Sequence, residues 1–331
     1  MEEIIYFFII LINFFLFKNL NYITEKLNFY DVPDQRKIHK KKISKIGGIF
    51  LYINVLFYLT LTFIFNNKII DNYFIIFLSI LFFISLINDK KDIKPKYRLV
   101  IFYFVFLAWS YFDKDLIIEN LYFQFANINL SLGEYGVYIT PLFFVIFLNA
   151  LNLFDGVNLQ SITYVFLFFI FLFLNNIELS NFFYLFIFIF FFSLYNFKNK
   201  VFLGDSGITI FAVIITYLII KNYNQNSDLL NCEEIFAIMF LPGVDMLRLY
   251  FYRIYKDKNP FLPDKNHIHH YILKIISEKY VFLYQLIVNS ILLFITYALN
   301  LSFFFILSFL LIIYSATIIG TYDKKSISKN I

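Results

Sequence analysis

Three of the four histidines in this chain lie together in His267-Ile268-His269-His270, inside a polar segment between two apolar stretches. Neutral imidazole can bind a metal ion or carry a proton, and imidazolium can hold a phosphate. Histidines at i, i+2 and i+3 do not share one face of a regular helix, so we expect them to line a pocket at a turn or helix end. A solvated loop is the alternative, but similar polar groups recur along the chain and favour a functional site.

The first of these groups ends an apolar stretch and contains Asn88, Asp89 and Asp92. At a helix end, carboxylates at i and i+3 lie on one face. There they could face a metal ion, a phosphate-bearing substrate or a neighbouring base. Taken alone, the group is better explained as an ordinary charged loop.

A polar stripe ends another apolar stretch. Asn149, Asn152 and Asp155 lie at i, i+3 and i+6, and Asn158 follows them. Polar groups at membrane depth are costly unless they have partners, so such a stripe is a functional candidate. A seam of hydrogen bonds between helices is the alternative.

Asp205 lies between Gly204 and Gly207 at the predicted start of a helix. Glycine lets the backbone approach a ligand closely, and a helix N-terminus offers free N–H groups to an anion. Mg²⁺ in proteins is usually held by one or two carboxylates together with substrate phosphates and water. Asp205 suits that role, and a helix N-cap is the alternative.

Two further groups contain bases. The segment from Asp31 to Gly48 is rich in lysine, which could hold anionic headgroups at about 1 kcal/mol each, but its embedded acids and His39 favour a substrate site. Asp245 and Arg248 lie in one apolar stretch. For that pair a structural ion pair is the first interpretation, and substrate contact is the second.

Apolar stretches must position all of these groups. The sequence is 60% hydrophobic and 15% charged, against about 25% charged in soluble domains. We predict an all-α polytopic membrane protein, one unit over residues 1–331 with about 11 transmembrane helices, and a short hairpin at 120–132. The predicted spans are 4–20, 46–66, 72–88, 97–112, 137–154, 161–176, 181–197, 206–221, 234–252, 281–299 and 302–320.

The distribution of positive charge predicts the orientation. Of the 28 lysines and arginines, only Lys68, Lys114 and Lys221 fall in loops on the less basic side. Cytoplasmic loops carry the excess of positive charge. The N-terminus is therefore predicted outside and the C-terminus in the cytoplasm, with every candidate group on the cytoplasmic face. The lysine- and asparagine-rich composition is typical of an AT-rich bacterial genome, which predicts a multi-pass protein of the bacterial cytoplasmic membrane.

In this order and on one face, these groups resemble the polyprenyl-phosphate N-acetylhexosamine-1-phosphate transferases of the glycosyltransferase 4 family. The resemblance extends from Asp31 to His270, and the sequence His-Ile-His-His is typical of the branch that starts O-antigen, enterobacterial common antigen or teichoic acid synthesis. It implies that undecaprenyl phosphate attacks a UDP-N-acetylhexosamine and releases UMP. Implied partners are these substrates and membrane lipids, with no nucleic acid, and a homodimer is allowed.

The resemblance also implies roles for residues. Asp205 would carry Mg²⁺, with Mn²⁺ as a substitute, Asp89 would act as base or positioner, and the histidines would hold the diphosphate. The predicted catalytic residues are Asp89, Asp155, His267, His269 and His270, the predicted metal ligand is Asp205, and the predicted substrate-binding residues are Arg36, Lys37, His39, Lys42, Asn88, Asp92, Asn149, Asn152, Asn158 and Asp264.

The chain departs from the family pattern in two places. Asn88-Asp89 stands where the family has two aspartates, and Asp155-Gly156-Val157-Asn158-Leu159 stands where it has Asp-Gly-x-Asp-Gly. An amide can form hydrogen bonds but cannot act as a base at neutral pH. Two other functions compete: an intramembrane aromatic prenyltransferase that uses Asn88, Asp89 and Asp92, and a non-enzymatic lipid flippase or transporter. The sequence does not name the sugar or the polymer.

Overall fold

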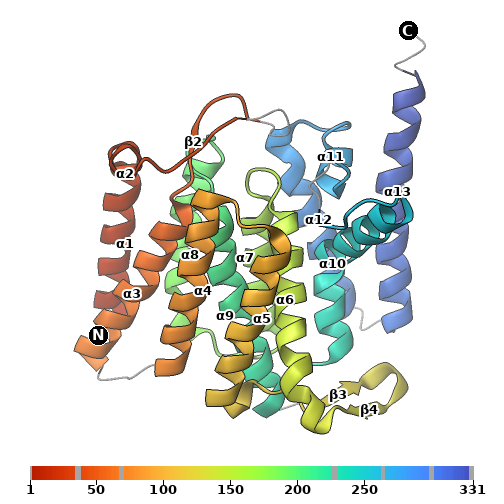
Figure 1. The fold of residues 1–331 in the computed structure, drawn as a ribbon, viewed down its shortest axis with the longest axis horizontal. Coiled ribbons are helices and arrows are strands. Elements are labelled where there is room, and N and C mark those ends of the chain that lie inside the picture. The colour runs from red at the N-terminus through yellow and green to blue at the C-terminus, as the bar shows by residue number, and fades with distance from the viewer. Residues whose placement is uncertain are drawn as a thin grey trace.

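The computed structural model describes residues 2–33, 39–66, 71–225, 230–261, 265–297 and 302–327. These residues are mostly helical (Figure 1). The α-helices are α1 (Glu2–Lys18), α2 (Leu20–Leu27), α3 (Gly47–Asn66), α4 (Asn72–Lys91), α5 (Pro95–Phe112), α6 (Gly136–Phe154), α7 (Gln160–Leu174), α8 (Tyr184–Asn196), α9 (Gly204–Gln225), α10 (Cys232–Tyr255), α11 (Ile268–Ile272), α12 (Val281–Tyr297) and α13 (Phe303–Ile327). Short 3₁₀ helices are η1 (Lys114–Leu116), η2 (Gln124–Ala126), η3 (Gly133–Tyr135), η4 (Ser180–Phe182) and η5 (Glu278–Tyr280).

Each predicted apolar stretch falls largely on a helix. Within the described residues, seven helices are long and apolar enough to cross a membrane. The pair α1 and α2, bent by 65°, would make eight. The prediction of a helical polytopic membrane protein is therefore confirmed. The number of 11 crossings stays a prediction, because α7 and α8 are shorter apolar helices. The orientation also stays a prediction.

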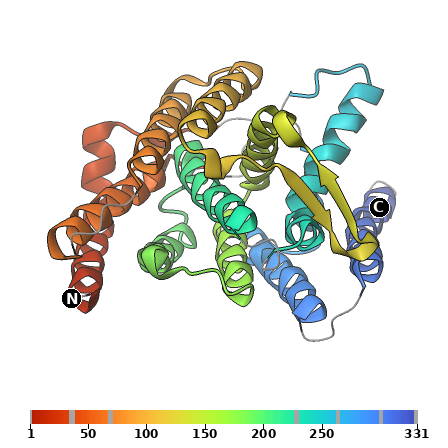
Figure 2. The same cartoon turned by 90° about the horizontal axis from the view of Figure 1, so that it is seen from below.

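Helix α9 is the centre of the bundle. It packs against α3, α4, α6 and α7. Of the residues in its apolar stretch 78% are buried, against 17% in α13. A helix that is apolar on all sides belongs in a core. Figure 2 looks along the helices and shows α9 surrounded by the others. Both ends of α9 are therefore held by several neighbours.

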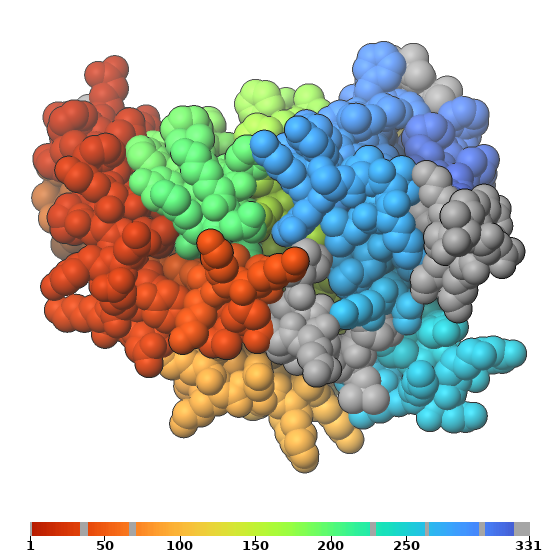
Figure 3. All heavy atoms as spheres, turned by 90° about the horizontal axis from the view of Figure 1, so that it is seen from above, coloured from red at the N-terminus to blue at the C-terminus, as the bar shows by residue number. Residues whose placement is uncertain are grey.

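At one end, two strands and a tight crossing fix the start of α9. Strand β1 (Tyr30–Asp31) pairs antiparallel with β2 (Ile43–Ser44), and Phe202 N–H donates to the Ser44 carbonyl at 2.7 Å. The start of α3 then crosses the start of α9. A Cβ on Gly48 would lie 2.4 Å from the backbone nitrogen of Gly207, so this approach needs a glycine. Figure 3 looks onto this end, where segments from distant parts of the sequence meet.

The hairpin predicted at 120–132 is confirmed. Strands β3 (Asn120–Phe123) and β4 (Ile128–Ser131) pair antiparallel, with Asn120 opposite Ser131. They lie at the opposite end of the bundle from α2 and α11, at the bottom of Figure 1.

Candidate active site

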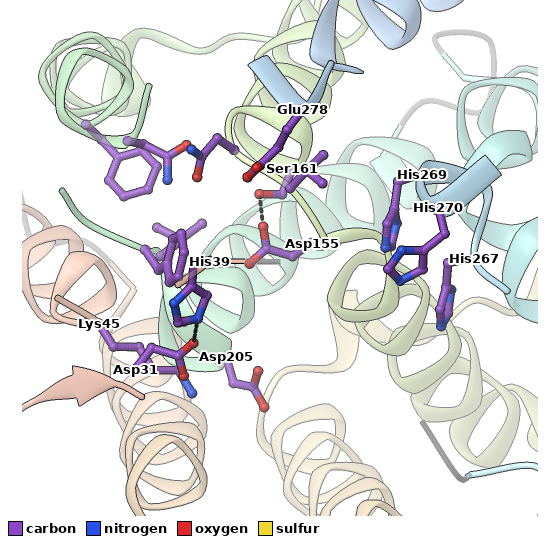
Figure 4. Close-up of a pocket in the computed structure, with 18 of the residues that line it drawn as sticks. Asp31, His39, Lys45, Asp155, Ser161, Asp205, His267, His269, His270 and Glu278 are labelled. Atoms are coloured by element: carbon purple, nitrogen blue, oxygen red, sulfur yellow. Dashed lines mark hydrogen bonds and ion pairs between the residues drawn. The ribbon is translucent and has the colours of Figure 1, made fainter. Parts of the chain in front are cut away.

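A cavity of about 470 Å³ opens at the end of the bundle where α9 begins. Figure 4 shows His267, His269 and His270 on one side of it, His39 across from them, and acidic side chains between. Its lining includes the polar residues Asp31, His39, Lys45, Asp155, Asn158, Ser161, Asn196, Asp205, Lys265, His267, His269, His270 and Glu278. Side chains separated by more than 200 residues in sequence thus share one space.

Asp205 reaches this cavity from the first turn of α9, and its carboxylate is surrounded by donors. Asn152 Nδ2 donates to Oδ1 at 2.9 Å, and Asn88 Nδ2 and the Arg98 guanidinium both donate to Oδ2. Arg98 also donates to Asn152 Oδ1 at 3.2 Å. The sequence placed no base beside Asp205, but the structure does, because α5 carries Arg98 to the start of α9.

Asp89, and not Asp205, caps α9. Its carboxylate accepts from Asp205 N–H at 2.9 Å and from Ser206 N–H at 3.0 Å. Lys45 Nζ lies 3.0 Å from Asp89 Oδ1, and the Asp89 side chain is 0% exposed. Burial lowers the pKa of the Lys45 ammonium, but the carboxylates of Asp89 and Asp205 outweigh this, and the pKa is raised. A carboxylate with three such donors is suited to positioning, one of the two roles predicted for Asp89.

Asp155 follows the end of α6 and lines the cavity. Ser161 Oγ donates to its Oδ1 at 2.5 Å. Burial raises the pKa of Asp155 to about 6, and the carboxylates of Asp205 and Asp89 add to this shift. Next to it, a Cβ on Gly156 would lie 2.1 Å from the His269 ring, so glycine lets the α6 end meet the histidine segment.

The histidines are organised by Asp245. Its carboxylate accepts from His267 Nδ1 at 3.1 Å, from Ile268 N–H at 3.1 Å and from Tyr314 OH at 2.9 Å. Arg248 Nη2 donates to it at 2.8 Å, so the predicted structural ion pair is confirmed. The bond to His267 Nδ1 fixes that ring and leaves Nε2 for a ligand.

His269 is a different kind of histidine. Burial lowers its pKa to about 3, and the neighbouring His270 and His267 add to this effect. Its ring lies 5.5 Å from that of His267 and 4.3 Å from that of His270, centroid to centroid. His269 is therefore neutral at physiological pH and can act as a hydrogen-bond partner but not as a cation.

The other predicted residues divide into four sets. His39 and Asn158 line the cavity, where His39 Nε2 lies 2.8 Å from Asp31 Oδ2 and Asn158 donates to Asn199 Oδ1 at 2.6 Å. Asn149 donates instead to Tyr250 OH at 2.7 Å. This is a hydrogen bond between helices, the alternative considered for the polar stripe that contains Asn149. Exposed residues outside the lining are Lys42 and Asp92. Arg36, Lys37 and Asp264 lie outside the described residues.

The donor set fits a divalent cation shared with a substrate. Within the described residues, no group of three or more His, Cys, Asp or Glu side chains is placed to hold a metal ion by itself. Mg²⁺, however, usually takes only one or two carboxylates and completes its shell with phosphates and water. Asp205 and Asp155 both line the cavity, and repulsion from Asp205 adds to the effect of burial in raising the pKa of Asp155. A cation between the nearby carboxylates and a bound phosphate would relieve this repulsion.

The chain is similar in sequence to known proteins. The model of the family "Glycosyl transferase family 4" matches residues 72–223. The chain is 26% identical over 286 residues to an Escherichia coli K12 protein, undecaprenyl-phosphate alpha-N-acetylglucosaminyl 1-phosphate transferase, covering 80% of this chain and 76% of that protein. A Thermotoga maritima protein of the same name is 26% identical over 324 residues, covering 94% of each chain. Over residues 72–223 the chain is similar to glycosyl transferase family 4.

The chain departs from the family pattern at positions 158 and 159, yet its backbone there still takes a conformation that suits glycine. Leu159 has φ +61°, the left-handed region in which the family pattern has glycine. Its N–H donates to Asn196 Oδ1 at 2.7 Å, and the Asn158 side chain is bonded to Asn199. Contacts to the last residue of α8 and to the segment after it therefore hold the turn without the second glycine. The departure at 88 removes a negative charge from the site.

Sequence reasoning missed several residues of the site. These are Arg98, Ser161, Asn196, Lys265 and Glu278, whereas Asp31 and Lys45 belong to the lysine-rich segment already favoured as a substrate site. One signal could have found Arg98, because the chain has only four arginines against 24 lysines. Each described arginine makes a hydrogen bond from its guanidinium, and a planar guanidinium suits buried ion pairs better than an ammonium. Ser161 and Glu278 have no such signal, because they reach the cavity only through helix packing.

Proposed function

We propose that this protein transfers a sugar 1-phosphate, N-acetylhexosamine-1-phosphate, from a UDP-sugar to undecaprenyl phosphate, to start synthesis of a cell-surface glycan. An acceptor phosphate oxygen attacks the β-phosphorus of the UDP-sugar. The bond from that phosphorus to the bridging oxygen breaks, and UMP leaves with the bridging oxygen. The product is a sugar joined to the lipid through a diphosphate.

One observation carries the proposal: Asp155 and Asp205 line the same cavity at the helix ends as the histidine segment. Phosphoryl transfer needs positioning and charge neutralisation more than covalent chemistry. His267, fixed by Asp245, and His270 would contact the diphosphate, while neutral His269 would add a hydrogen bond. Asp155, with Asn152 behind Asp205, would face the nucleotide. Asp89 would position the start of α9.

Magnesium belongs to the proposal as a cofactor, with manganese as a substitute. Asp205 would hold the ion. Asp155 would contribute to the site, because its pKa responds to the charge of Asp205. Bound there, the ion would neutralise the phosphate charge that builds up during transfer.

We also propose that the cavity faces the cytoplasm, with the N-terminus outside, in the cytoplasmic membrane of a bacterium. The charge asymmetry of the loops supports this orientation. A reporter fused after Lys258 should read as cytoplasmic. A periplasmic reading would overturn this orientation and with it access of the nucleotide to the cavity.

The activity is tested with purified protein, undecaprenyl phosphate and radiolabelled UDP-sugars. UDP-N-acetylglucosamine is the first donor to try, because the similar proteins carry that sugar in their names. The expected result is Mg²⁺-dependent release of UMP and transfer of label into butanol. If no UDP-sugar gives either product under conditions where the protein stays folded, the proposed function is wrong.

A further inference from the structure

The acidic centre at the start of α9 is already neutralised by the protein's own bases. Asp205 contacts Arg98, and Asp89 contacts Lys45, so two carboxylates are matched by two cations. The Arg98 side chain is 9% exposed and the Asp89 side chain 0%. Because one partner of each pair is buried, salt screens these ion pairs less than it screens pairs on the surface.

Asn88 completes this neutral arrangement. Its amide is buried and donates to Asp205 Oδ2, while its own oxygen accepts from Ile93 N–H at 2.8 Å. Aspartate, which the family pattern has here, could not donate to Asp205 and would add a negative charge beside it. The amide thus holds the Asp205 carboxylate and leaves the centre with one charge fewer.

We propose that Asn88 and Arg98 keep Asp205 compensated, so that a divalent cation binds here only together with the phosphates of the nucleotide. The inference rests on the proposed function. A free cation meets no excess negative charge at Asp205 and would have to compete with Arg98 for its oxygens. A nucleotide diphosphate brings the missing negative charge into the adjoining cavity, and Mg²⁺ favours such mixed shells of carboxylate and phosphate. Asn88 and Arg98 are positioning residues in this scheme.

The test measures Mn²⁺ binding to the full-length protein in detergent, from the electron paramagnetic resonance signal of free Mn²⁺. UDP serves as the diphosphate probe because it has no sugar to transfer, and a protein-free sample corrects for Mn²⁺ held by UDP. Saturating UDP should tighten Mn²⁺ binding to the wild type by about tenfold or more. This is the effect expected when the negative charge of the diphosphate is added close to the ion in a partly buried site. Equal affinity with and without UDP would overturn the inference.

Variants separate the two residues. Asn88→Asp and Arg98→Gln should each bind Mn²⁺ without UDP about tenfold more tightly than the wild type, because each leaves Asp205 with uncompensated negative charge. Arg98→Lys keeps the cation and should behave as the wild type. Asn127→Asp adds the same charge on the exposed β3–β4 hairpin and should change nothing.

The outcomes distinguish this inference from the proposed function. If Asn88→Asp and Arg98→Gln fold but leave Mn²⁺ affinity without UDP unchanged, the compensation scheme is wrong, even where the wild type releases UMP. If the wild type shows UDP-dependent Mn²⁺ binding but transfers no sugar, the scheme holds and the proposed function fails.

Discussion

The two ends of α9 carry the same residue types in different settings. At its start, Lys45 lies 3.0 Å from Asp89, with Asp205 nearby. Near its other end, Lys221 lies 3.2 Å from Asp71 and 3.0 Å from Asp113. The two centres are about 24 Å apart along the helix, at 1.5 Å per residue. Each combines one lysine with two aspartates.

What differs is what the acids do besides pairing. Asp71 caps α4 and Asp113 ends α5, so the Lys221 centre ties helix ends together. Asp71 is 23% exposed, and none of these three residues lines the cavity described above. At the start of α9 the capping is done by Asp89, which leaves Asp205 to face the cavity. The comparison teaches that an acid is a candidate for chemistry when another residue has taken over its structural role.

The largest expected effect is at Asp205. Asp205→Asn should lower the rate of UMP release by about a thousandfold or more, because a metal ligand commonly contributes several kcal/mol to the barrier. Asp71→Asn is the matched control at the other end and should keep the rate within about twofold. Wild-type rate and wild-type Mg²⁺ dependence in Asp205→Asn would place the metal site elsewhere.

Next in size is the histidine segment. Replacing His269 and His270 together with Ala should leave the protein inserted in the membrane but slow turnover by about a hundredfold or more, since preorganised donors at the reacting phosphate are lost. Activity and membrane fractionation of the double variant provide the measurement. Normal turnover would mean that these two side chains take no part in the reaction.

Asp155 predicts a pH dependence. Its pKa is raised to about 6, so kcat/KM should fall below pH 6 as the carboxylate takes up a proton, and Asp155→Asn should lose this inflection.

The raised pKa of Asp155 also affects stability, because the folded protein binds the proton more tightly than the unfolded chain does. Stability is therefore greatest below pH 4 for this group and is lost as pH rises through 6. At pH 7, Asp155→Asn should raise the thermal transition by a few degrees.

The smallest effect on activity is expected at Lys221. Lys221→Met leaves two aspartates without their cation and should lower the free energy of unfolding by about 1–2 kcal/mol. The rate of UMP release should stay near that of the wild type. Lys45→Met is the matched substitution at the other end and should lower the rate clearly. Equal effects of the two variants on activity would remove the distinction between the two ends of α9.

The apolar stretches and the alternation at 120–132 are local signals, which explains why each stretch falls on a helix and the hairpin is confirmed. Helix propensity and apolar length act within about 20 residues and do not depend on distant partners. Local signals do not fix the number of crossings, since α7 and α8 are apolar but shorter than the helices that are long enough to span a membrane.

The sequence by itself determined which polar residues gather in groups between and at the ends of the apolar stretches. Seven of the predicted residues line one cavity: His39, Asp155, Asn158, Asp205, His267, His269 and His270. Only the tertiary structure decided their partners. Arg98 and Asp205 are 107 residues apart in sequence, and Asp89 and Asp205 are 116 apart. Which side chain caps α9 and which faces the cavity depends on the order in which α3, α4, α5 and α6 surround it. No local pattern fixes that order, because the apolar faces of these helices are much alike.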